Sequence, residues 1–291
     1  MNRMYGIQNF LIILFVNVAI LSCAQTPQSK TIAKQTLSPK DSLLLNKYFY
    51  KMDEYNLYSE NRGKYIDSIL QIIPDNAQMW QQRGMLLCKE KKYELGMPYL
   101  DSAVKYNRNQ YLDYRAFMKC IFTKNYTASI EDFKAAKLLK GNTYIMDHTY
   151  DFYTGLCYLQ LNKFDSAEYL FTQTIEDEKS QHGASWVHHL HWFYLGVVKY
   201  EKEEYQNAIS CFDSSINIYS RFSDAKYYKA LCLEKLKKYK EASETMDQAD
   251  NDSKHGTTIN EDNVIYEMYP YQVYKHVLEH YTKQLKDENK R

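Results

Sequence analysis

Residues 155–174 read GLCYLQLNKFDSAEYLFTQT, and residues 196–215 read GVVKYEKEEYQNAISCFDSS. In both stretches a glycine is followed by small or aromatic residues at offsets of 9, 12, 16 and 19 positions. The same offsets define five series between Gln78 and Ala249, which begin 33 to 41 residues apart. A unit that recurs at this period indicates stacked supersecondary repeats rather than one globular core. The series are Gly84, Tyr93, Gly96, Leu100, Ala103; Phe117, Tyr126, Ser129, Phe133, Ala136; Gly155, Phe164, Ala167, Phe171, Thr174; Gly196, Tyr205, Ala208, Phe212, Ser215; and Ala230, Tyr239, Ala242, Met246, Ala249.

Each unit is predicted to form two helices joined by a short turn. The first residue of a series is small in four units, which lets the two helices approach closely, and Phe117 is the exception. An aromatic residue marks the turn in every unit, for example Tyr93. The residues 3, 7 and 10 positions after this aromatic lie on one face of the second helix, as expected for a buried stripe. One hairpin cannot bury its stripe alone, whereas stacked hairpins can.

This pattern resembles the tetratricopeptide repeat (TPR) family over roughly residues 76–250. Trp80 and Trp192 add to the resemblance, because a large aromatic is usual four residues before the small residue. The stretch Pro74–Ala77 is similar to the proline-bearing junction between two repeats. The resemblance implies an all-α fold, a right-handed α-solenoid of stacked helix-turn-helix TPR units with a C-terminal capping helix.

We expect the chain to be organised in five segments. Residues 1–22 are interpreted as a signal peptide of the lipoprotein type, and residues 23–40 as a flexible tether. Residues 41–76 are expected to form a divergent first helical repeat, and residues 77–250 the five TPR-like repeats. Residues 251–291 are interpreted as a linker and a C-terminal helix.

The C-terminal segment admits two interpretations. After a polar break at residues 251–263, residues 264–285 regain apolar and tyrosine-rich character, and Pro270 suits the first turn of a helix. Such a helix would cap the apolar end of the solenoid. The alternative is that this tail folds back into the groove of the solenoid and competes with a partner.

The first 22 residues have the pattern of an export signal. Arg3 is their only charge, and residues 10–21 form an apolar run that is too short for a permanent membrane span. The stretch Ile20–Cys23 resembles the lipobox of bacterial lipoproteins, in which Cys23 becomes the lipidated first residue. The alternative is simple secretion after cleavage behind Ala24. Because no acidic cluster follows Cys23, the resemblance favours a lipid anchor in the outer membrane, facing the periplasm.

The balance of charge argues against nucleic acid as the main partner. The formal net charge is +1, and without residues 1–22 there are 36 basic and 36 acidic residues. Phosphate binding needs a basic stripe, which a locally mixed charge distribution does not supply. Tyrosine is abundant, at 29 residues, so some tyrosines are available for a recognition surface.

Cysteine and histidine each have a structural and a functional interpretation. The five cysteines after Cys23 are widely spaced and are expected to be buried filler, although two could pair if neighbouring repeats align them. Four histidines between residues 182 and 191 form the one compact set of potential metal ligands. His188 and His191 are three positions apart and can share a helix face, but no cysteine or carboxylate has matching spacing. They are a weak metal candidate, and we expect neither a metal nor a cofactor.

No catalytic motif is present in the sequence. There is no Gly-x-Ser-x-Gly, no glycine-rich phosphate loop and no His-Glu-x-x-His. The acidic runs at residues 176–178 and 201–204 suit solvated helix ends rather than a partly desolvated acid–base site. We therefore expect a binding protein and not an enzyme.

The resemblance also implies where a partner binds. In TPR proteins the first helix of each unit lines a concave groove, at offsets of −6, −3, +1, +4 and +5 from the small residue. In the middle units these positions are apolar or aromatic, which suits a hydrophobic peptide or an amphipathic helix. The alternative is packing within the protein, because exposed apolar patches of this size are rare. The predicted partner-binding residues are Met85, Tyr111, Tyr114, Met118, Phe152, Leu156, Phe193, Val197, Tyr200 and Tyr227, and Lys89, Glu201 and Asp224 also lie at groove offsets.

Together these features predict an exported TPR scaffold or adaptor that binds a protein segment in its concave groove at the cell envelope. One alternative is an accessory lipoprotein of outer-membrane assembly, since small TPR lipoproteins serve that task in some bacteria. Another is a glycan-capturing lipoprotein, in which tyrosines and Trp186 or Trp192 hold sugar rings. Aromatic rings that are buried at helix crossings would argue against the glycan alternative.

Overall fold

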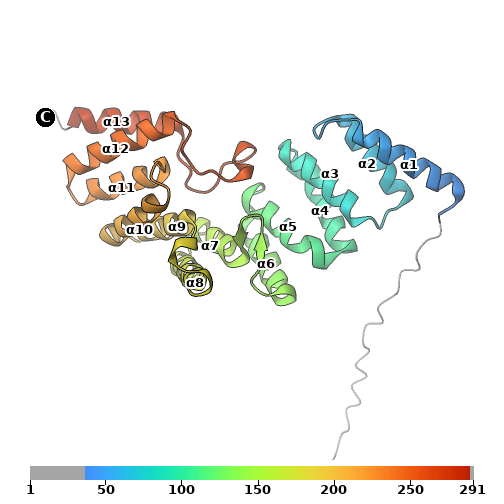
Figure 1. The fold of residues 1–291 in the computed structure, drawn as a ribbon, viewed down its shortest axis with the longest axis horizontal. Coiled ribbons are helices and arrows are strands. Elements are labelled where there is room, and N and C mark those ends of the chain that lie inside the picture. Colours follow the sequence, from blue (N-terminus) through green and yellow to red (C-terminus); the bar gives the residue numbers. More distant parts are fainter. Residues whose placement is uncertain (1–36, 289–291) are drawn as a thin grey trace, which may run out of the picture.

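The computed structural model describes residues 37–288, which are mostly helical (Figure 1). Two short strands form an antiparallel hairpin in which Tyr144 pairs with Thr149. The elements are α1 Pro39–Asp53, α2 Glu60–Ile72, α3 Ala77–Lys89, α4 Tyr93–Tyr106, α5 Arg108–Ile121, α6 Tyr126–Lys140, β1 Tyr144–Ile145, β2 His148–Thr149, α7 Tyr150–Gln160, α8 Phe164–His182, the 3₁₀ helix η1 Ala184–Trp186, α9 His189–Glu201, α10 Tyr205–Ile218, α11 Ser223–Lys235, α12 Tyr239–Lys254, the 3₁₀ helix η2 Asp262–Ile265 and α13 Lys275–Glu288.

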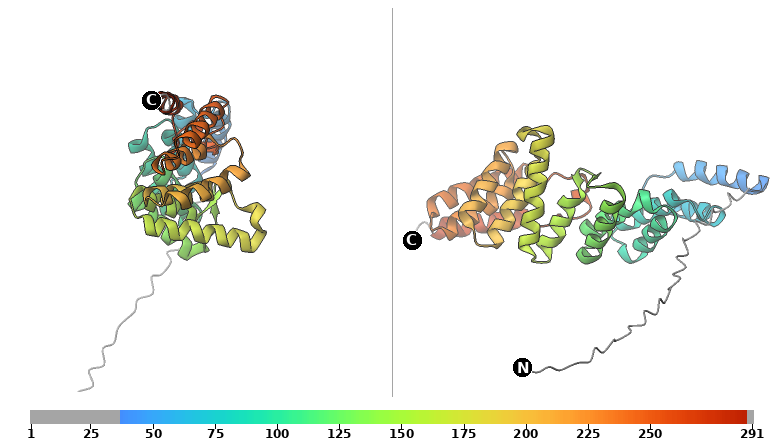
Figure 2. Two further views of the ribbon diagram at one scale, coloured as in Figure 1. Left: turned by 90° about the vertical axis from the view of Figure 1, so that its left-hand side faces the viewer. Right: turned by 90° about the horizontal axis from the view of Figure 1, so that it is seen from below.

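Consecutive helices pack as hairpins, and the hairpins stack into an elongated arc (Figures 1 and 2). The first helices of successive repeats also touch one another: α5 contacts α7, α7 contacts α9, and α9 contacts α11. They form the inner layer of the arc, and the second helix of each repeat packs against its own first helix. The prediction of an all-α solenoid of helical hairpins is confirmed.

The repeated offsets correspond to one contact between the two helices of a hairpin. A Cβ atom on Gly196 would lie 2.6 Å from a ring carbon of Phe212, sixteen positions later. A Cβ on Gly155 would lie 3.0 Å from the ring of Phe171 in the same way. The small residue on the first helix is therefore required because the ring on the second helix packs directly against the backbone.

The five turns inside the repeats share one backbone conformation. The residue two positions before each turn aromatic has a positive φ, between 55° and 62°. In the last turn the N–H of Lys238 then donates to the carbonyl of Leu233 at 2.9 Å, which is the Schellman pattern of a helix end. The second helix begins at the aromatic itself. The residues with positive φ are Lys91, Lys124, Asn162, Glu203 and Lys237.

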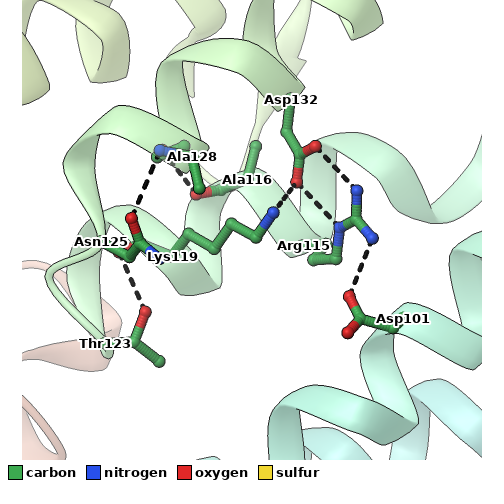
Figure 3. A network of polar contacts seen from close by, with 9 residues as sticks. Asp101, Arg115, Ala116, Lys119, Thr123, Asn125, Ala128 and Asp132 are labelled. Carbon is green, nitrogen blue, oxygen red and sulfur yellow. Dashed lines mark hydrogen bonds and ion pairs between the residues drawn. The ribbon is translucent and has the colours of Figure 1, made fainter.

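The second unit, which has Phe117 in place of a small residue, has its own set of contacts. The Phe117 ring packs edge-on against Tyr153 of the next repeat, with ring centroids 5.3 Å apart. Arg115 bridges Asp101 of α4 and Asp132 of α6, with N–O distances of 2.8 and 2.7 Å (Figure 3). Arg115 thereby ties two repeats together at the point where the pattern of small residues is interrupted.

The two ends of the solenoid are closed differently. At the N-terminal end α1 and α2 form a helical hairpin whose small core contains Met52 and Ile66. At the C-terminal end α13 packs against α12 and buries Leu278 and Leu285. The predicted capping helix is therefore present.

The start of the capping helix differs from the prediction based on Pro270. The helix begins at Lys275, and Pro270 lies in the segment before it. Two features keep this segment out of the helix: Tyr271 has a φ of 59°, and the N–H of Val273 donates to the side chain of Asp224.

The predicted signal peptide, the lipidation candidate Cys23 and most of the predicted tether lie outside the described residues. Their interpretation stays a prediction. Within residues 37–288, none of the helices combines the length and the apolar character needed to cross a membrane.

Candidate functional site

The concave face of the solenoid is occupied by residues 257–274, which we call the inner loop. The inner loop connects α12 to α13 and extends across the arc towards α3 before it returns (Figure 1). Ile259 and Tyr269 of this loop are only 0% and 3% exposed and belong to the main hydrophobic core. In this structure α13 caps the solenoid and the segment before it lies in the groove, whereas competition of this segment with a partner stays a prediction.

The tip of the inner loop contacts the N-terminal half of the solenoid. The hydroxyl of Tyr266 is hydrogen-bonded to the hydroxyl of Tyr58, and Lys89 Nζ lies 4.4 Å from the centre of the Tyr266 ring. The next residue, Glu267, accepts a hydrogen bond from the hydroxyl of Tyr93. An aromatic residue followed by an acidic one thus meets a surface of tyrosine and lysine side chains.

The main chain of the inner loop is bound by side chains of the solenoid. Lys124 Nζ, at the turn between α5 and α6, donates to the carbonyl oxygen of Met268 at 2.7 Å. The hydroxyl of Tyr194, on α9, donates to the carbonyl oxygen of Pro270 at 3.1 Å. Carbonyl groups are present in every peptide, so these donors supply contacts that do not depend on the sequence of the bound segment.

Asp224, at the start of α11, holds both ends of the inner loop. Its Oδ2 accepts from the N–H of Ile259 at 3.1 Å and from Thr258 Oγ1 at 2.6 Å, and its Oδ1 accepts from the N–H of Val273 at 2.7 Å. The side chain is fully buried, and this burial raises the pKa of Asp224 to about 6, against the opposing effect of these hydrogen bonds. One carboxylate therefore closes a loop that crosses the concave face twice.

The predicted partner-binding residues pack mostly inside the protein. Phe152 stacks on His148 with ring centroids 3.9 Å apart, and Tyr227 packs edge-on against Tyr281 of α13. Only Met85, Tyr114 and Tyr200 are half-buried. In this structure the face packs within the protein, which is the alternative to partner binding. A role of these residues in partner binding stays a prediction. The buried members are Tyr111, Met118, Phe152, Leu156, Phe193, Val197 and Tyr227.

Some contacts of the inner loop were indicated by the sequence and others were missed. Lys89, Glu201 and Asp224 lie at groove offsets and do contact the inner loop, Glu201 by accepting from the Tyr271 hydroxyl at 2.8 Å. Tyr194 was missed because its offset, two positions before the small residue, was assigned to no face. The available signal was a tyrosine that recurs at this offset, as Tyr153, Tyr194 and Tyr228.

A cluster of histidines and carboxylates lies where the inner loop passes β2 and the start of α9. His148 Nε2 is 3.1 Å from Glu261 Oε1, and His148 Nδ1 is 3.1 Å from His191 Nε2. His191 Nδ1 is in turn 3.0 Å from Glu178 Oε2. The ring of His188 lies beside His148, with centroids 4.9 Å apart. The fold thus joins His188 and His191 to a third histidine and two carboxylates, which the spacing in the sequence did not indicate.

Burial determines the charge of these groups. It lowers the pKa of His148 well below its usual value and that of His188 to about 4, so both imidazoles are neutral at neutral pH. Burial raises the pKa of Glu261. For Glu178 burial also acts upwards, but the interaction with His191 and the hydrogen bond from the backbone N–H of His188 outweigh it and lower the pKa. Neutral imidazoles and an ionised carboxylate are the forms in which such groups bind metals.

The five cysteines among the described residues are free thiols and are all buried. Cys120 and Cys157 lie in neighbouring inner helices, close enough for their thiols to interact, and burial raises the pKa of Cys120 well above its usual value. Protonated thiols of this kind behave as small apolar residues, as expected from the sequence.

A hollow on another part of the surface lies between α6, α7 and α8. It has a volume of about 480 Å³, and its lining includes Lys137, Tyr158 and Tyr169. The Tyr169 side chain is 63% exposed. This hollow is a second surface at which a binding partner can be tested.

No protein-family model matches the chain, and no curated protein sequence matches it either. Solved structures do match it. A tetratricopeptide repeat protein from Parabacteroides merdae ATCC 43184 is 15% identical, with a TM-score of 0.60 over 87% of this chain and 89% of that one. PilW, described as a widely conserved type IV pilus biogenesis factor, is 14% identical, with a TM-score of 0.56 over 75% and 96%. Yeast Tom70 is 14% identical, with a TM-score of 0.55 over 84% of this chain and 47% of its own. The chain has the TPR fold.

Proposed function

We propose that this TPR solenoid is a non-catalytic adaptor of the cell envelope that binds an extended protein segment along its concave face. The observation that carries the proposal is that this face already binds an extended segment, the inner loop of the same chain. Lys124 and Tyr194 donate to main-chain carbonyls, while Lys89 and Tyr93 contact side chains of the loop. A partner segment with the same chemistry would bind the same groups after the tip of the inner loop is displaced.

The chemistry of the tip defines the partner segment. Tyr266 and Glu267 meet Lys89, Tyr93 and Lys124, so the preferred segment is extended and carries an aromatic residue next to an acidic one. The salt bridge between Lys124 and Glu267 is long, at 3.8 Å, and Lys124 is about a third exposed. Exposed pairs of this kind contribute about 1 kcal/mol or less, which suits an exchangeable contact.

The location at the envelope rests on the sequence. The apolar run before Ile20–Cys23 supports export. The proposal includes lipidation of Cys23, which would anchor the protein in the outer membrane with the solenoid in the periplasm. The structural similarity to PilW, a pilus biogenesis factor, agrees with a role at the envelope. A role as an accessory lipoprotein of outer-membrane assembly is one form that such an adaptor could take.

Glycan capture is the less favoured alternative. Sugar rings stack on exposed aromatic faces, whereas Phe152, Phe193 and Tyr194 of the inner layer are fully buried. Trp186 is exposed at 71%, but Trp192 is half-buried and its ring lies 4.9 Å from Lys179 Nζ. Of these two tryptophans only Trp186 has an exposed ring for a sugar to stack on, whereas several side chains of the concave face already bind an extended peptide segment.

The proposal is tested with two sets of variants that have opposite expected effects. In the first, Tyr266→Ala and Glu267→Ala weaken the tip of the inner loop without altering the face. In the second, Lys89→Ala and Lys124→Ala alter the face itself. A labelled synthetic peptide of residues 262–272 is added to each purified protein, and its binding is measured by fluorescence anisotropy. We expect tighter binding than wild type for the first set and weaker binding for the second.

The same variants are compared in crosslinking experiments on native membranes. The amount of specific envelope proteins recovered with the crosslinked protein should increase for the first set and decrease for the second. Lys240→Ala, an exposed lysine on α12, is the control and should leave both measurements unchanged. If all variants bind the peptide equally and recover the same proteins, the concave face is structural, and the hollow between α6, α7 and α8 becomes the surface to test.

A further inference from the structure

Three parts of the chain that are far apart in the sequence bring histidine and glutamate side chains together in the interior. His148 comes from β2, His188 precedes α9, and Glu261 belongs to the inner loop. One ligand atom from each of the three lies within 4.8 Å of the other two. His148 is fully buried and Glu261 is 6% exposed, whereas His188 is half-buried.

The hydrogen bonds of this cluster cannot all form with neutral imidazoles and ionised carboxylates. Four groups make a chain of three contacts: Glu178 with His191, His191 with His148, and His148 with Glu261. A carboxylate has no hydrogen to donate, and a neutral imidazole has only one N–H. Two hydrogens are therefore available for three contacts, and the third contact is satisfied only when the cluster also holds a proton or a metal cation.

The charge of the cluster leads to the same requirement. The only ion pairs of Glu178 and Glu261 among the described residues are those with His191 and His148. Two buried carboxylates without lysine or arginine partners are costly, because burial removes the hydration of each charge. A dication would neutralise both carboxylates, whereas one proton would neutralise one.

We propose that His148, His188 and Glu261 form a binding site for a transition-metal dication of the Zn²⁺ class. Two imidazoles and one carboxylate are ligands that Zn²⁺ accepts, with water as the fourth ligand in a tetrahedral site. At Zn–ligand distances of about 2.0–2.2 Å, neighbouring ligand atoms are about 3.3 Å apart. The observed 3.1 Å between His148 Nε2 and Glu261 Oε1 is close to this spacing.

A metal on His148 Nε2 completes the hydrogen bonds behind it. His148 Nδ1–H then donates to His191 Nε2, and His191 Nδ1–H donates to Glu178, so every contact has one hydrogen. This arrangement fixes the tautomer of the ligand from the side away from the metal, as carboxylate–histidine pairs do in known zinc sites. His191 and Glu178 are therefore positioning residues, and they do not bind the metal themselves.

The third ligand requires a small rearrangement. His188 Nδ1 accepts from the N–H of Leu190 at 3.3 Å, a long helix cap, which leaves Nε2 for the metal. Binding at Nε2 places the ring hydrogen on Nδ1 and breaks this cap. Because Glu261 lies in the inner loop, the bound metal would also tie this loop to α9 and to β2.

The test uses tag-free protein freed of metal, with Zn²⁺ alone as the probe. After dialysis against Zn²⁺ and removal of the excess, we expect elemental mass spectrometry to find one Zn²⁺ per chain. We also expect the Tm of the protein with Zn²⁺ to be higher than that of the metal-free protein. Co²⁺ should give the visible absorption of tetrahedral coordination. Glu261→Gln should bind Zn²⁺ at least about 100-fold more weakly, since it removes a charged ligand. This variant should still fold, because its amide can donate to His148 Nε2 and complete the hydrogen bonds without a cation.

His188→Asn is the second variant, because asparagine keeps the cap of α9 while it removes the third ligand. Glu178→Gln should weaken binding about 10- to 100-fold through the orientation of His191 and His148. His276→Gln, an exposed histidine on α13, is the control and should bind as wild type does. The proposal would be overturned if wild type does not retain Zn²⁺. It would also be overturned if Glu261→Gln and His188→Asn retain as much Zn²⁺ as wild type and show the same rise in Tm. The cluster would then hold only a proton.

Discussion

The backbone N–H of Val273 donates a hydrogen bond of 2.7 Å to Oδ1 of Asp224, and the other oxygen of the same carboxylate binds the start of the inner loop. Asp224 thereby holds both ends of the inner loop against the concave face. The inner loop has little regular structure apart from η2, so its position depends on contacts with the solenoid, and Asp224 makes three of them from a fully buried side chain.

The buried carboxyl of Asp224 predicts a specific pH dependence. Its folded-state pKa of about 6 lies above the value of 3.8 for an exposed aspartate, so the folded protein binds more protons between these values. Its contribution to the free energy of unfolding is therefore fully present below pH 4 and is lost as the pH rises through 6, by about 2–3 kcal/mol. Asp224→Asn has no carboxyl at this position, so its free energy of unfolding should lack this pH dependence. The difference in the free energy of unfolding between wild type and Asp224→Asn should therefore shrink from pH 4 to pH 7 in urea titrations. A constant deficit would contradict the raised pKa.

Tyr194→Phe removes the donor to the carbonyl of Pro270 without changing the packing of the ring. Because the Tyr194 side chain is 0% exposed, the carbonyl of Pro270 loses its donor in a buried position. The variant should therefore lose about 1–3 kcal/mol in the free energy of unfolding. Hydrogen exchange should accelerate in residues 262–272 more than in α3 to α6. Tyr239→Phe, at a tyrosine that is 49% exposed, is the matched control and should change neither stability nor exchange.

Gly196→Ala tests the contact that underlies the repeat pattern. The new Cβ would lie 2.6 Å from Phe212, so the ring or the helix must move, and overpacking of this kind costs about 1–3 kcal/mol. The fifth unit pairs Ala230 with Met246 at the same two positions, which suggests the compensating change Phe212→Met. In a double-mutant cycle by thermal unfolding, the double variant should be more stable than the sum of the single effects predicts. Additive effects would show that the two positions do not interact.

Lys237→Gly should stabilise the fifth repeat. Lys237 has a φ of 62°, a left-handed conformation that costs a non-glycine residue about 1–2 kcal/mol, part of which glycine loses again to backbone entropy. We expect a net gain of about 0.5–1 kcal/mol in the free energy of unfolding. Glu244→Gly, at an exposed position in the middle of α12, should instead lose about 1 kcal/mol. If both variants are destabilised, the turn does not hold its left-handed geometry in solution.

The repeat pattern alone was sufficient to predict the solenoid. The offsets from Gly196 to Tyr205 and Phe212 repeat because each hairpin makes the same local contact, and local contacts leave a periodic trace in the sequence. The start of each second helix at its turn aromatic follows from the same periodicity. The left-handed residues, such as Lys91 and Glu203, were not foreseen, since no glycine or asparagine marks most of them.

The occupied concave face and the metal candidate depended on tertiary structure. Glu261 meets His148 across 113 positions, and Val273 meets Asp224 across 49. Such contacts leave no period in a single sequence, because one residue of each pair lies in the inner loop, a segment that occurs once. The sequence by itself therefore determined that the chain forms stacked helical hairpins. Only the tertiary structure decided which surface of these hairpins is covered, since an irregular loop is positioned by the side chains that it meets and not by a pattern of its own.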